Sequence, residues 1–395
     1  MKDTAAFLEA FLNHELPQLL PPSKLKKEER LHSWRKRSIT TLFGPILLHR
    51  AYYLGPKGSC CPLDDQLGLC DQYTPAVAQL MCWTGAMDPS FEQASESLRR
   101  LTGLDIPGRQ IQRIIRRFAS HSREWKKNRM EKEPQKPVTI LNIQADMTGI
   151  PMRPEELIDI KGKQSDGSAK TRQIKIGCVF TQAIDSKGQP QRIPSSSVYV
   201  SSFGEVHDFS NLLHAEALKA GYARAQKVVF LGDGAEWIWN MVEKRFRGSV
   251  QIVDFYHACE HLHTLCETLE SDSGCIDALF HAWRRRLKNN GLPGIIRKAE
   301  KMASLLSRVR KKSVLEQLAY FRTNAARMTY RSFRRNGFFI GSGAVEGACR
   351  HIVCQRAKLS GMRWLISGAD AVLVFRCLIK SNLFDDYCVV WPYAA

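Results

Sequence analysis

Three acidic residues stand where metal-dependent chemistry could use them. Asp146 follows the apolar run TILNIQA, Asp233 follows VVFLG, and Glu346 comes just after the Gly-Ser-Gly of 341–343, in the expected first turn of a helix. Two-metal phosphoryl transfer needs carboxylates from separate elements, because two cations about 4 Å apart must be held by hard oxygen ligands. The three residues therefore predict a catalytic site for two Mg²⁺ or Mn²⁺ ions, with each residue as a metal ligand.

Each of these positions also has an ordinary structural explanation. An aspartate after a strand is a common turn residue, and a glutamate in a first helical turn is stabilised by the helix dipole. Asp254 also follows an apolar run, VQIV, and on the residues alone it competes with Asp233. Gly234 favours Asp233, because a glycine permits a sharp turn and a close ligand approach.

The elements that would position these side chains alternate between strands and helices. Apolar, β-branched runs predict strands, and helical periodicity predicts helices. In chain order they are strands over 137–146, 172–184 and 193–203, a helix over 211–223, a strand over 227–233, a helix over 236–246 and a strand over 250–255. This is the order found in RNase H-like cores. In open α/β sheets, ligand sites lie at the carboxyl ends of the strands.

A long helical segment separates this core from the glutamate. From about 258 to 335 the sequence is helical and basic, and it contains RRRLK and RVRKK. The stretch between Asp233 and Glu346 is far too long for a connecting loop. The predicted fold class is therefore α/β, with an RNase H-like catalytic core over 137–257 and 336–395 that is interrupted by an all-α insertion over 258–335.

The part ahead of the core is mainly helical and is expected to bind DNA. Residues 1–72 predict a helix and a β-hairpin, and 127–137 is polar and contains prolines, which is typical of a domain boundary. Residues 73–126 predict helices, two of which are joined by a short turn after Gly103 and resemble a helix-turn-helix. The charged stretch 24–38 fits either a linker or a DNA-contacting strip.

Basic side chains on the predicted helices are the candidate DNA contacts. A basic helix face is also commonly just solvated, so composition does not decide between the two. Trp283 precedes a basic run and is a candidate for stacking on a distorted or flipped base, with a core position as the alternative. The candidate DNA-binding residues are Arg113, Arg116 and Arg117 in the helix pair, Trp283, Arg284 and Arg285 in the insertion, and Arg350, Arg356 and Lys358 after the glutamate.

The composition favours a polyanionic partner and a reducing compartment. Lysine and arginine number 58 against 39 aspartates and glutamates, which gives a net charge of +19. The 12 cysteines are diluted over 395 residues. The first residues, MKDTAAFLEAFLNHELPQLL, predict an amphipathic helix rather than a signal peptide, and no apolar stretch reaches membrane-spanning length. We expect a soluble, cytoplasmic protein with no membrane partner.

Several longer motifs resemble those of ISKra-type insertion-sequence transposases, bacterial relatives of the Mutator-like DDE group. They are PLDDQLGL (62–69), TPAV (74–77), SFEQA (90–94), IKIGCVF (174–180), LGDGAEWIW (231–239), VDFYHA (253–258) and GSGAVEGACRHIVCQRAKLSGMRW (341–364). The resemblance implies a DNA transposase whose DDE triad is Asp146, Asp233 and Glu346. It further implies binding to terminal inverted repeats, metal-dependent phosphodiester hydrolysis, and joining of 3′-hydroxyl ends to target DNA.

The resemblance also implies partners, location and auxiliary residues. A homodimer or higher oligomer would bind double-stranded DNA at transposon ends and target, associated with the bacterial nucleoid. VDFYH matches the C/D-x-x-H signature of these transposases, which makes Asp254 and His257 possible auxiliary residues. His257 fits a contact to DNA, orientation of a carboxylate, or a buried structural position. The family's Cys-x-x-Cys pairs are missing, and the adjacent Cys60 and Cys61 cannot replace them, so bound zinc is not expected.

Three other functions stay open on the sequence. A stand-alone nuclease or resolvase would use the same chemistry without strand transfer, because a fold alone does not fix function. An inactive or domesticated remnant of an element would bind DNA without catalysis. A basic RNA-binding protein is disfavoured, since no RNA-recognition motif is evident.

Overall fold

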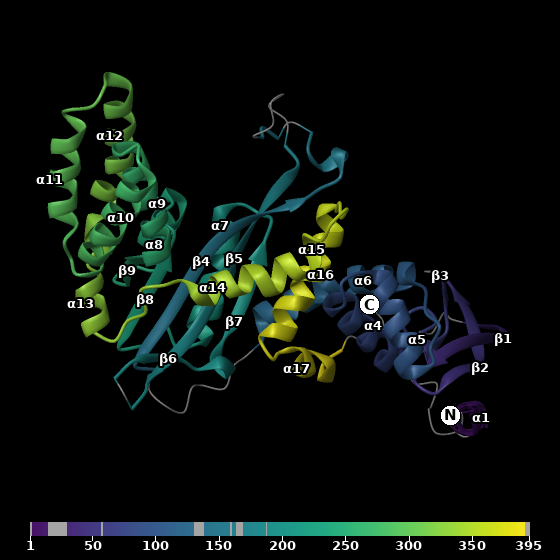
Figure 1. Ribbon diagram of the computed structural model, residues 1–395. Helices are drawn as coiled ribbons and strands as arrows, with labels where there is room; N and C mark the ends of the chain where they lie inside the picture. Colours follow the sequence, from purple (N-terminus) through teal and green to yellow (C-terminus); the bar gives the residue numbers. More distant parts are fainter. Residues whose placement is uncertain are drawn as a thin grey trace. The chain divides into compact units, whose positions relative to one another are not determined.

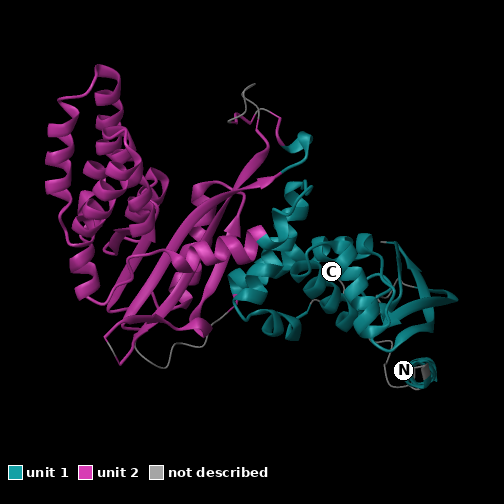
Figure 2. Cartoon of the chain, viewed as in Figure 1, with its two compact units in different colours: residues 1–128, 152–156, 355–395 teal, residues 129–151, 157–354 magenta. Residues whose placement is uncertain are grey.

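The protein has two compact units. A computed structural model describes residues 2–14, 30–56, 58–129, 138–158, 160–162, 169–186 and 188–391. Unit 1 comprises Met1–Asn128, Met152–Glu156 and Gln355–Ala395, and unit 2 comprises Arg129–Pro151 and Leu157–Cys354 (Figure 2). The domain boundary predicted over 127–137 falls mostly outside the described residues.

Unit 1 begins with a helix and a three-stranded antiparallel sheet. The elements are α1 (Lys2–His14), β1 (Arg30–Thr41), β2 (Gly44–Gly55) and β3 (Gly58–Cys60), with sheet order β1-β2-β3. The predicted hairpin is confirmed, and Glu9 of α1 accepts a hydrogen bond from the backbone N–H of Leu47 on β2 (2.8 Å). β1 includes 30–38 of the charged stretch expected as a linker or DNA strip, while 24–29 lie outside the described residues.

The rest of unit 1 is helical. Its helices are α3 (Pro62–Gln66), α4 (Pro75–Met87), α5 (Phe91–Thr102), α6 (Gly108–Asn128), α15 (Gln355–Ala357), α16 (Ile366–Lys380) and α17 (Phe384–Val389). The helix pair predicted around Gly103 is confirmed as α5 and α6. Ser90 caps α5 by accepting the N–H of Gln93 (3.0 Å), and Gly103 ends it with a left-handed φ of 72°. None of the described helices is long and apolar enough to cross a membrane.

The C-terminal segment belongs with these helices. The sequence predicts that all of 336–395 belongs to the catalytic core, whereas in the structure 355–395 group with unit 1. The reason is α16, which is buried along most of its length and packs against α4 and α6. A helix that is apolar on nearly every face must be enclosed by others, and the sequence does not say which ones enclose it.

Unit 2 is built on a mixed sheet (Figure 1). Its strands are β4 (Ile140–Pro151), β5 (Thr171–Ile184), β6 (Pro190–Arg192), β7 (Val198–Ser202), β8 (Lys227–Gly232) and β9 (Val250–Val253). The order is β6-β5-β4-β8-β9, with β7 also paired to β5; β5 is antiparallel to β4 and β7, whereas β8 is parallel to β4 and β9 to β8. The strand expected over 193–203 is shortened to β7, because 194–196 form a 3₁₀ turn.

Opposite faces of the sheet receive different helices. Successive strand residues point to opposite faces. Gly177 of β5 lies under Leu213 of α7 (Val206–Lys219), so α7 covers one face. Gln144 lies on β4 opposite Cys178, the neighbour of Gly177, and accepts the backbone N–H of Val345 (2.9 Å), so α14 (Gly343–Ala348) covers the other face.

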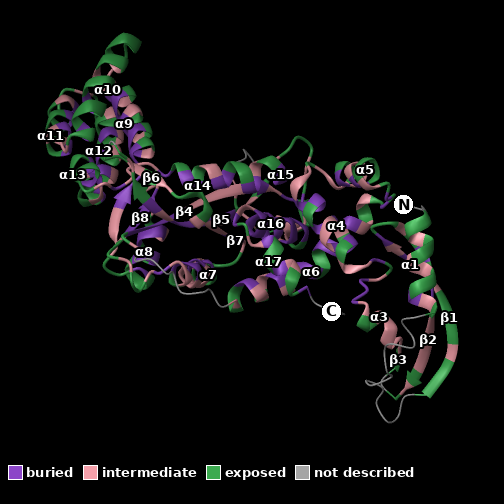
Figure 3. Ribbon diagram, turned by 90° about the horizontal axis from the view of Figure 1, so that it is seen from below, coloured by how far each residue is buried: buried purple, intermediate pink, exposed green. Residues whose placement is uncertain are grey.

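A run of helices separates β9 from α14. It comprises α9 (Phe255–Leu269), α10 (Ser273–Lys288), α11 (Leu292–Ala303), α12 (Arg308–Thr323) and α13 (Tyr330–Arg335), and α8 (Glu236–Arg245) joins β8 to β9. The apolar core of the sheet continues into these helices through residues such as Phe255, Leu262 and Phe321. Figure 3 shows the buried positions of β8 and α9 that form this shared core. The helical segment and the sheet are thus one packed body.

The contact between α7 and the sheet predicts a stability effect at Gly177. A Cβ there would lie 2.7 Å from Leu213 Cδ1 and 2.9 Å from Val200 Cγ2. We expect Gly177→Val to lower the free energy of unfolding by about 1–3 kcal/mol through overpacking. In the matched control Gly294→Ala on α11, the added Cβ meets no described atom within 4 Å, and a gain of about 0.5–1 kcal/mol is expected. Urea unfolding measures both changes; equal stability of the two variants would contradict this packing.

Candidate metal centre

Asp146 on β4 and Asp233, the residue directly after β8, lie at the same level of two neighbouring parallel strands. The last register pair of β4 with β8 is Gln144 with Leu231, and each aspartate stands two residues beyond its member of that pair. Asp146 does not end its strand as predicted. β4 continues to Pro151, because its other edge stays paired with β5, and Asp146 lies two residues beyond the last pair with β8.

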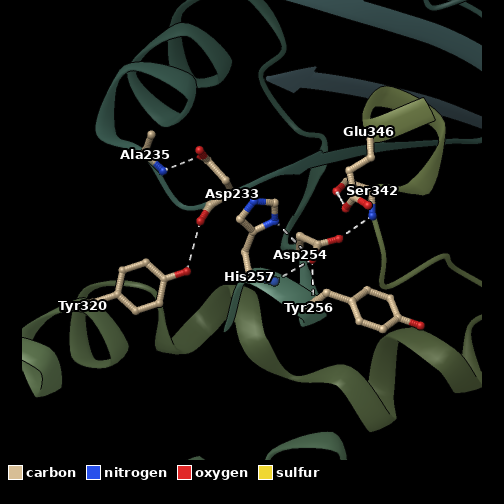
Figure 4. Close-up of polar contacts among 8 residues, drawn as sticks. All are labelled: Asp233, Ala235, Asp254, Tyr256, His257, Tyr320, Ser342 and Glu346. Atoms are coloured by element: carbon tan, nitrogen blue, oxygen red, sulfur yellow. Dashed lines mark hydrogen bonds and ion pairs between the residues drawn. The ribbon is translucent and has the colours of Figure 1, made fainter. Parts of the chain in front are cut away.

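Asp254 is the first residue after β9 and is completely buried. Its Oδ1 accepts the backbone N–H groups of Tyr256 (2.6 Å) and His257 (2.8 Å), so it caps the start of α9 (Figure 4). Its Oδ2 accepts the backbone N–H of Ser342. The strand predicted over 250–255 therefore ends early, because the aspartate begins a helix instead.

Glu346 on α14 is brought to this edge of the sheet by polar contacts on both sides of it. The Ser342 hydroxyl donates to Glu346 Oε1 (2.7 Å). Cys349 donates its thiol hydrogen to Asp146 Oδ2 (3.3 Å). Residues three apart lie on the same side of a helix, so Glu346 and Cys349 both face the sheet edge that bears Asp146.

The helix that follows the glutamate differs from the predicted one. The sequence predicts that a helix begins before Glu346; in the structure α14 passes into a π-helical segment over Cys349–Cys354 and then into α15. Such π segments are rare in proteins, and those that occur are often found at functional sites. Here the segment begins at Cys349, the residue that contacts Asp146.

Asp254 and His257 form an ion pair beside Glu346. Ligand atoms of Asp254, His257 and Glu346 all lie within 4.8 Å of one another, which is a spacing that could hold a metal ion. The side-chain hydrogen bond to Asp254 outweighs burial and raises the pKa of His257 to about 9. Burial alone would raise the pKa of Asp254, but hydrogen bonds from His257 and Ser342 lower it. The hydrogen bond thus favours the charged forms of both Asp254 and His257, and their ligand atoms lie beside Glu346.

The electrostatics of Asp146 are of a different kind. Burial raises the pKa of its carboxyl group, and the negative charge of Asp233 raises it further, against hydrogen bonds from Met147 and Cys349. Asp233 accepts the backbone N–H of Ala235 through Oδ1 (2.8 Å). Two neighbouring carboxylates that repel each other are stabilised in their charged forms by a divalent cation between them. Asp146 and Asp233 therefore form an acidic pair that a cation could bridge, whereas Glu346 has its closely spaced ligand neighbours in Asp254 and His257 among the described residues.

The candidate DNA contacts are mostly exposed. Arg113, Arg116 and Arg117 lie on the open face of α6, where Arg113 and Arg117 both pair with Asp71 (3.0 and 3.1 Å). Four more are placed as follows: Arg284, Arg285 and Arg350 are exposed, and Lys358 is half-buried. These side chains are accessible to a DNA partner, and their role as DNA contacts stays a prediction.

Two of the candidate DNA contacts do not fit the structure. Trp283 is 1% exposed in the core of unit 2, so it cannot stack on a base in this conformation. Arg356 is also 1% exposed; its guanidinium donates to the backbone carbonyl of Gly85 near the end of α4 (3.2 Å) and lies over the ring of Phe91. Burial lowers the pKa of Arg356 to about 10. Trp283 thus packs in the apolar core of unit 2, and Arg356 is held inside unit 1 by a backbone carbonyl and an aromatic ring.

Several residues of the centre were not predicted. Gln144 holds the start of α14, Ser342 orients Glu346, and Cys349 contacts Asp146. A polar Gln144 inside an apolar strand was the available signal, because a buried amide needs a partner. Ser342 was expected only as part of a helix start, and nothing in the sequence distinguishes Cys349 from the other cysteines.

These features define an α/β protein with acidic side chains gathered at the carboxyl edge of its parallel strands. The chain belongs to UPF0236, described as an uncharacterised protein family, whose model matches residues 2–374. One relative is the "UPF0236 protein in vanSb 3'region" of Streptococcus gallolyticus, 25% identical over 360 residues that cover 89% of this chain and 74% of the relative. A solved structure, the Drosophila P element transposase strand transfer complex, covers 82% of this chain and 83% of its own at 9% identity and a TM-score of 0.28. An overlap that low does not identify a shared fold.

The Asp254–His257 pair predicts a pH dependence of stability. The pKa of His257 is raised from its ordinary 6.5 to about 9 in the folded protein, so its contribution is fully present below pH 6.5 and is lost as the pH rises through 9. We expect the unfolding free energy of the wild type to fall more steeply between pH 6.5 and 9.5 than that of His257→Gln. Urea unfolding across this range measures the difference, and parallel pH profiles would show that the pair contributes nothing.

Proposed function

We propose that this protein is an insertion-sequence DNA transposase with an RNase H-like core, in which Asp146, Asp233 and Glu346 hold two Mg²⁺ or Mn²⁺ ions. The observation that supports this most is the matched position of Asp146 and Asp233 on adjacent parallel strands. Gln144 on β4 accepts the backbone N–H of Val345 on α14, and Cys349, directly after α14, donates to Asp146; both contacts hold the glutamate-bearing helix against β4. In this proposal carboxylates from three separate elements act together, as two-metal chemistry requires.

The sheet topology supports the RNase H-like assignment. Antiparallel β4, β5 and β7 come first, and α7, β8, α8 and β9 follow, with β8 and β9 parallel to β4. This is the strand and helix order of RNase H-like cores. In that interpretation α9 to α13 are the predicted insertion. It begins at Phe255, directly after Asp254, and not at 258 as predicted.

The chemistry follows from the oxygen ligands and their supports. When bound, one divalent ion would activate the attacking water or 3′-hydroxyl and the other would stabilise the leaving oxygen. Within the chain, the Ser342 hydroxyl orients the carboxylate of Glu346, and the thiol of Cys349 orients that of Asp146. The Asp254–His257 pair holds the loop before Glu346 in place. We propose Asp233 rather than Asp254 as the second aspartate of the triad, because Asp254 already accepts three backbone N–H groups.

The DNA partner is inferred from charge and from the motifs. A net charge of +19 favours double-stranded DNA, and α6 presents three arginines on one exposed face. The resemblance to ISKra-type transposases makes the terminal inverted repeats of the element and its target DNA the substrates. Paired ends would require a homodimer or higher oligomer, in a cell compartment shared with bacterial DNA.

Removing single carboxylates tests the triad. We expect Asp146→Asn, Asp233→Asn and Glu346→Gln each to reduce Mg²⁺-dependent cleavage of DNA carrying the element's ends by more than about 100-fold, because even outer partners of metal ligands contribute that much. DNA binding should persist. Glu236→Gln, an exposed carboxylate in the first turn of α8, is the matched control and should cleave normally. Full activity of any triad variant would exclude that residue, and products without joined ends would indicate a nuclease.

Substitutions on α6 test DNA recognition. Replacing Arg113, Arg116 and Arg117 together with alanine should weaken binding to end DNA by at least about 10-fold and should flatten the dependence of affinity on salt, because each phosphate contact releases counterions. Fluorescence anisotropy over a salt series measures both. An unchanged salt slope would mean that this face is only solvated.

A further inference from the structure

We propose that Tyr320, in the helical segment between β9 and α14, is a positioning residue for the metal ligand Asp233. This inference rests on the proposed function, because it assigns Asp233 to the metal centre. Tyr320 lies on α12, far from Asp233 in sequence, and its hydroxyl donates to the backbone carbonyl of Asp233 (3.0 Å; Figure 4). The side chain thereby connects the helical segment to the loop that bears the aspartate.

The ring of Tyr320 is held in one orientation by a second contact. It stacks on the imidazole of His261, with ring centroids 3.7 Å apart and an angle of 21° between the planes. His261 comes from α9, the helix that begins at Asp254. Two helices of the segment therefore fix the phenol before it reaches Asp233, which reduces the entropy lost in making the hydrogen bond.

Gly234 provides the third contact. Its φ is +100°, a conformation that favours glycine, and a Cβ at this position would lie 2.8 Å from both Cε2 and the hydroxyl oxygen of Tyr320. The tyrosine thus occupies the space that any other residue at 234 would need. The turn after β8 and the ring of Tyr320 are fitted to each other.

Together these contacts fix the geometry of Asp233 at two levels. Its side chain is oriented by the N–H of Ala235, and its backbone is anchored by the hydroxyl of Tyr320. Metal sites need ligands held to within about 0.5 Å, and the partners behind the ligands provide that precision. Loss of the phenol hydroxyl should therefore weaken metal binding more than it weakens the fold.

The chain offers a matched control in the same helical segment. Tyr330 is fully buried, and its hydroxyl has no hydrogen-bond partner among the described residues. Tyr320→Phe and Tyr330→Phe each remove one phenol oxygen, but only the first removes a contact to Asp233. A purely structural role for Tyr320 would make the two variants alike in metal binding.

The experiment is an Mn²⁺ titration of the full chain, followed by the electron paramagnetic resonance signal of free Mn²⁺. We expect Tyr320→Phe to bind Mn²⁺ about 10-fold more weakly than the wild type, as for loss of other outer partners of metal ligands, and Tyr330→Phe to bind like the wild type. Asp233→Asn should bind weakly as well.

Two failures of this experiment are distinguishable. If the wild type binds Mn²⁺ and Asp233→Asn does not, but Tyr320→Phe binds like Tyr330→Phe, then Tyr320 does not position the ligand and the proposed function stands. If the wild type binds no Mn²⁺, or Asp233→Asn binds it normally, the proposed function fails and this inference fails with it.

Discussion

One buried carboxylate closes the long excursion of the chain between the sheet and the glutamate. Asp254 accepts N–H groups from Tyr256 and His257, where the helical segment begins, and from Ser342, where it ends. The backbone N–H of Phe255 also donates to the carbonyl of Ile340 (2.8 Å), which ties the same two ends together. A charged group buried this deeply is tolerated only when it is fully hydrogen-bonded and paired, and the protonated His257 completes that requirement. Because the ends are tied, Glu346 is delivered beside the strands that bear the other acids.

Asp146 and Asp233 carry like charges close together, and the described hydrogen bonds do not neutralise them. Burial and the charge of Asp233 raise the pKa of Asp146, whereas hydrogen bonds lower the pKa of the buried Asp254. Cys349, Ser342 and the turn after β8 orient these groups without neutralising them. Divalent cations would supply positive charge for Asp146 and Asp233. Asp254 already has hydrogen-bond donors for its charge, and we therefore propose a structural role for it and a metal-binding role for the other two.

The sequence predicts this arrangement in part. Local sequence predicts that strands end near Asp233 and Asp254 and that a helix begins before Glu346, because short-range patterns determine strand ends and helix caps. Local sequence does not predict that β4 continues past Asp146, since this depends on pairing with the distant strand β5. Asp254 competes with Asp233 on pattern alone, because both follow apolar strands, and the backbone donors that Asp254 accepts come from segments that no local pattern identifies. Burial of Trp283 and Arg356, and the grouping of α16 with unit 1, depend on packing partners that no local pattern names. The chain belongs to UPF0236, and its resemblance to ISKra-type transposases stays a prediction.

The most direct test of the central claim is to locate the ions themselves. Anomalous diffraction from crystals soaked in Mn²⁺ should show density between Asp146, Asp233 and Glu346, with His257 outside the coordination sphere and still paired with Asp254. Density bound instead by Asp254, His257 and Glu346, the alternative set of closely spaced ligand atoms, would contradict the account. So would crystals that take up no Mn²⁺ at this edge of the sheet.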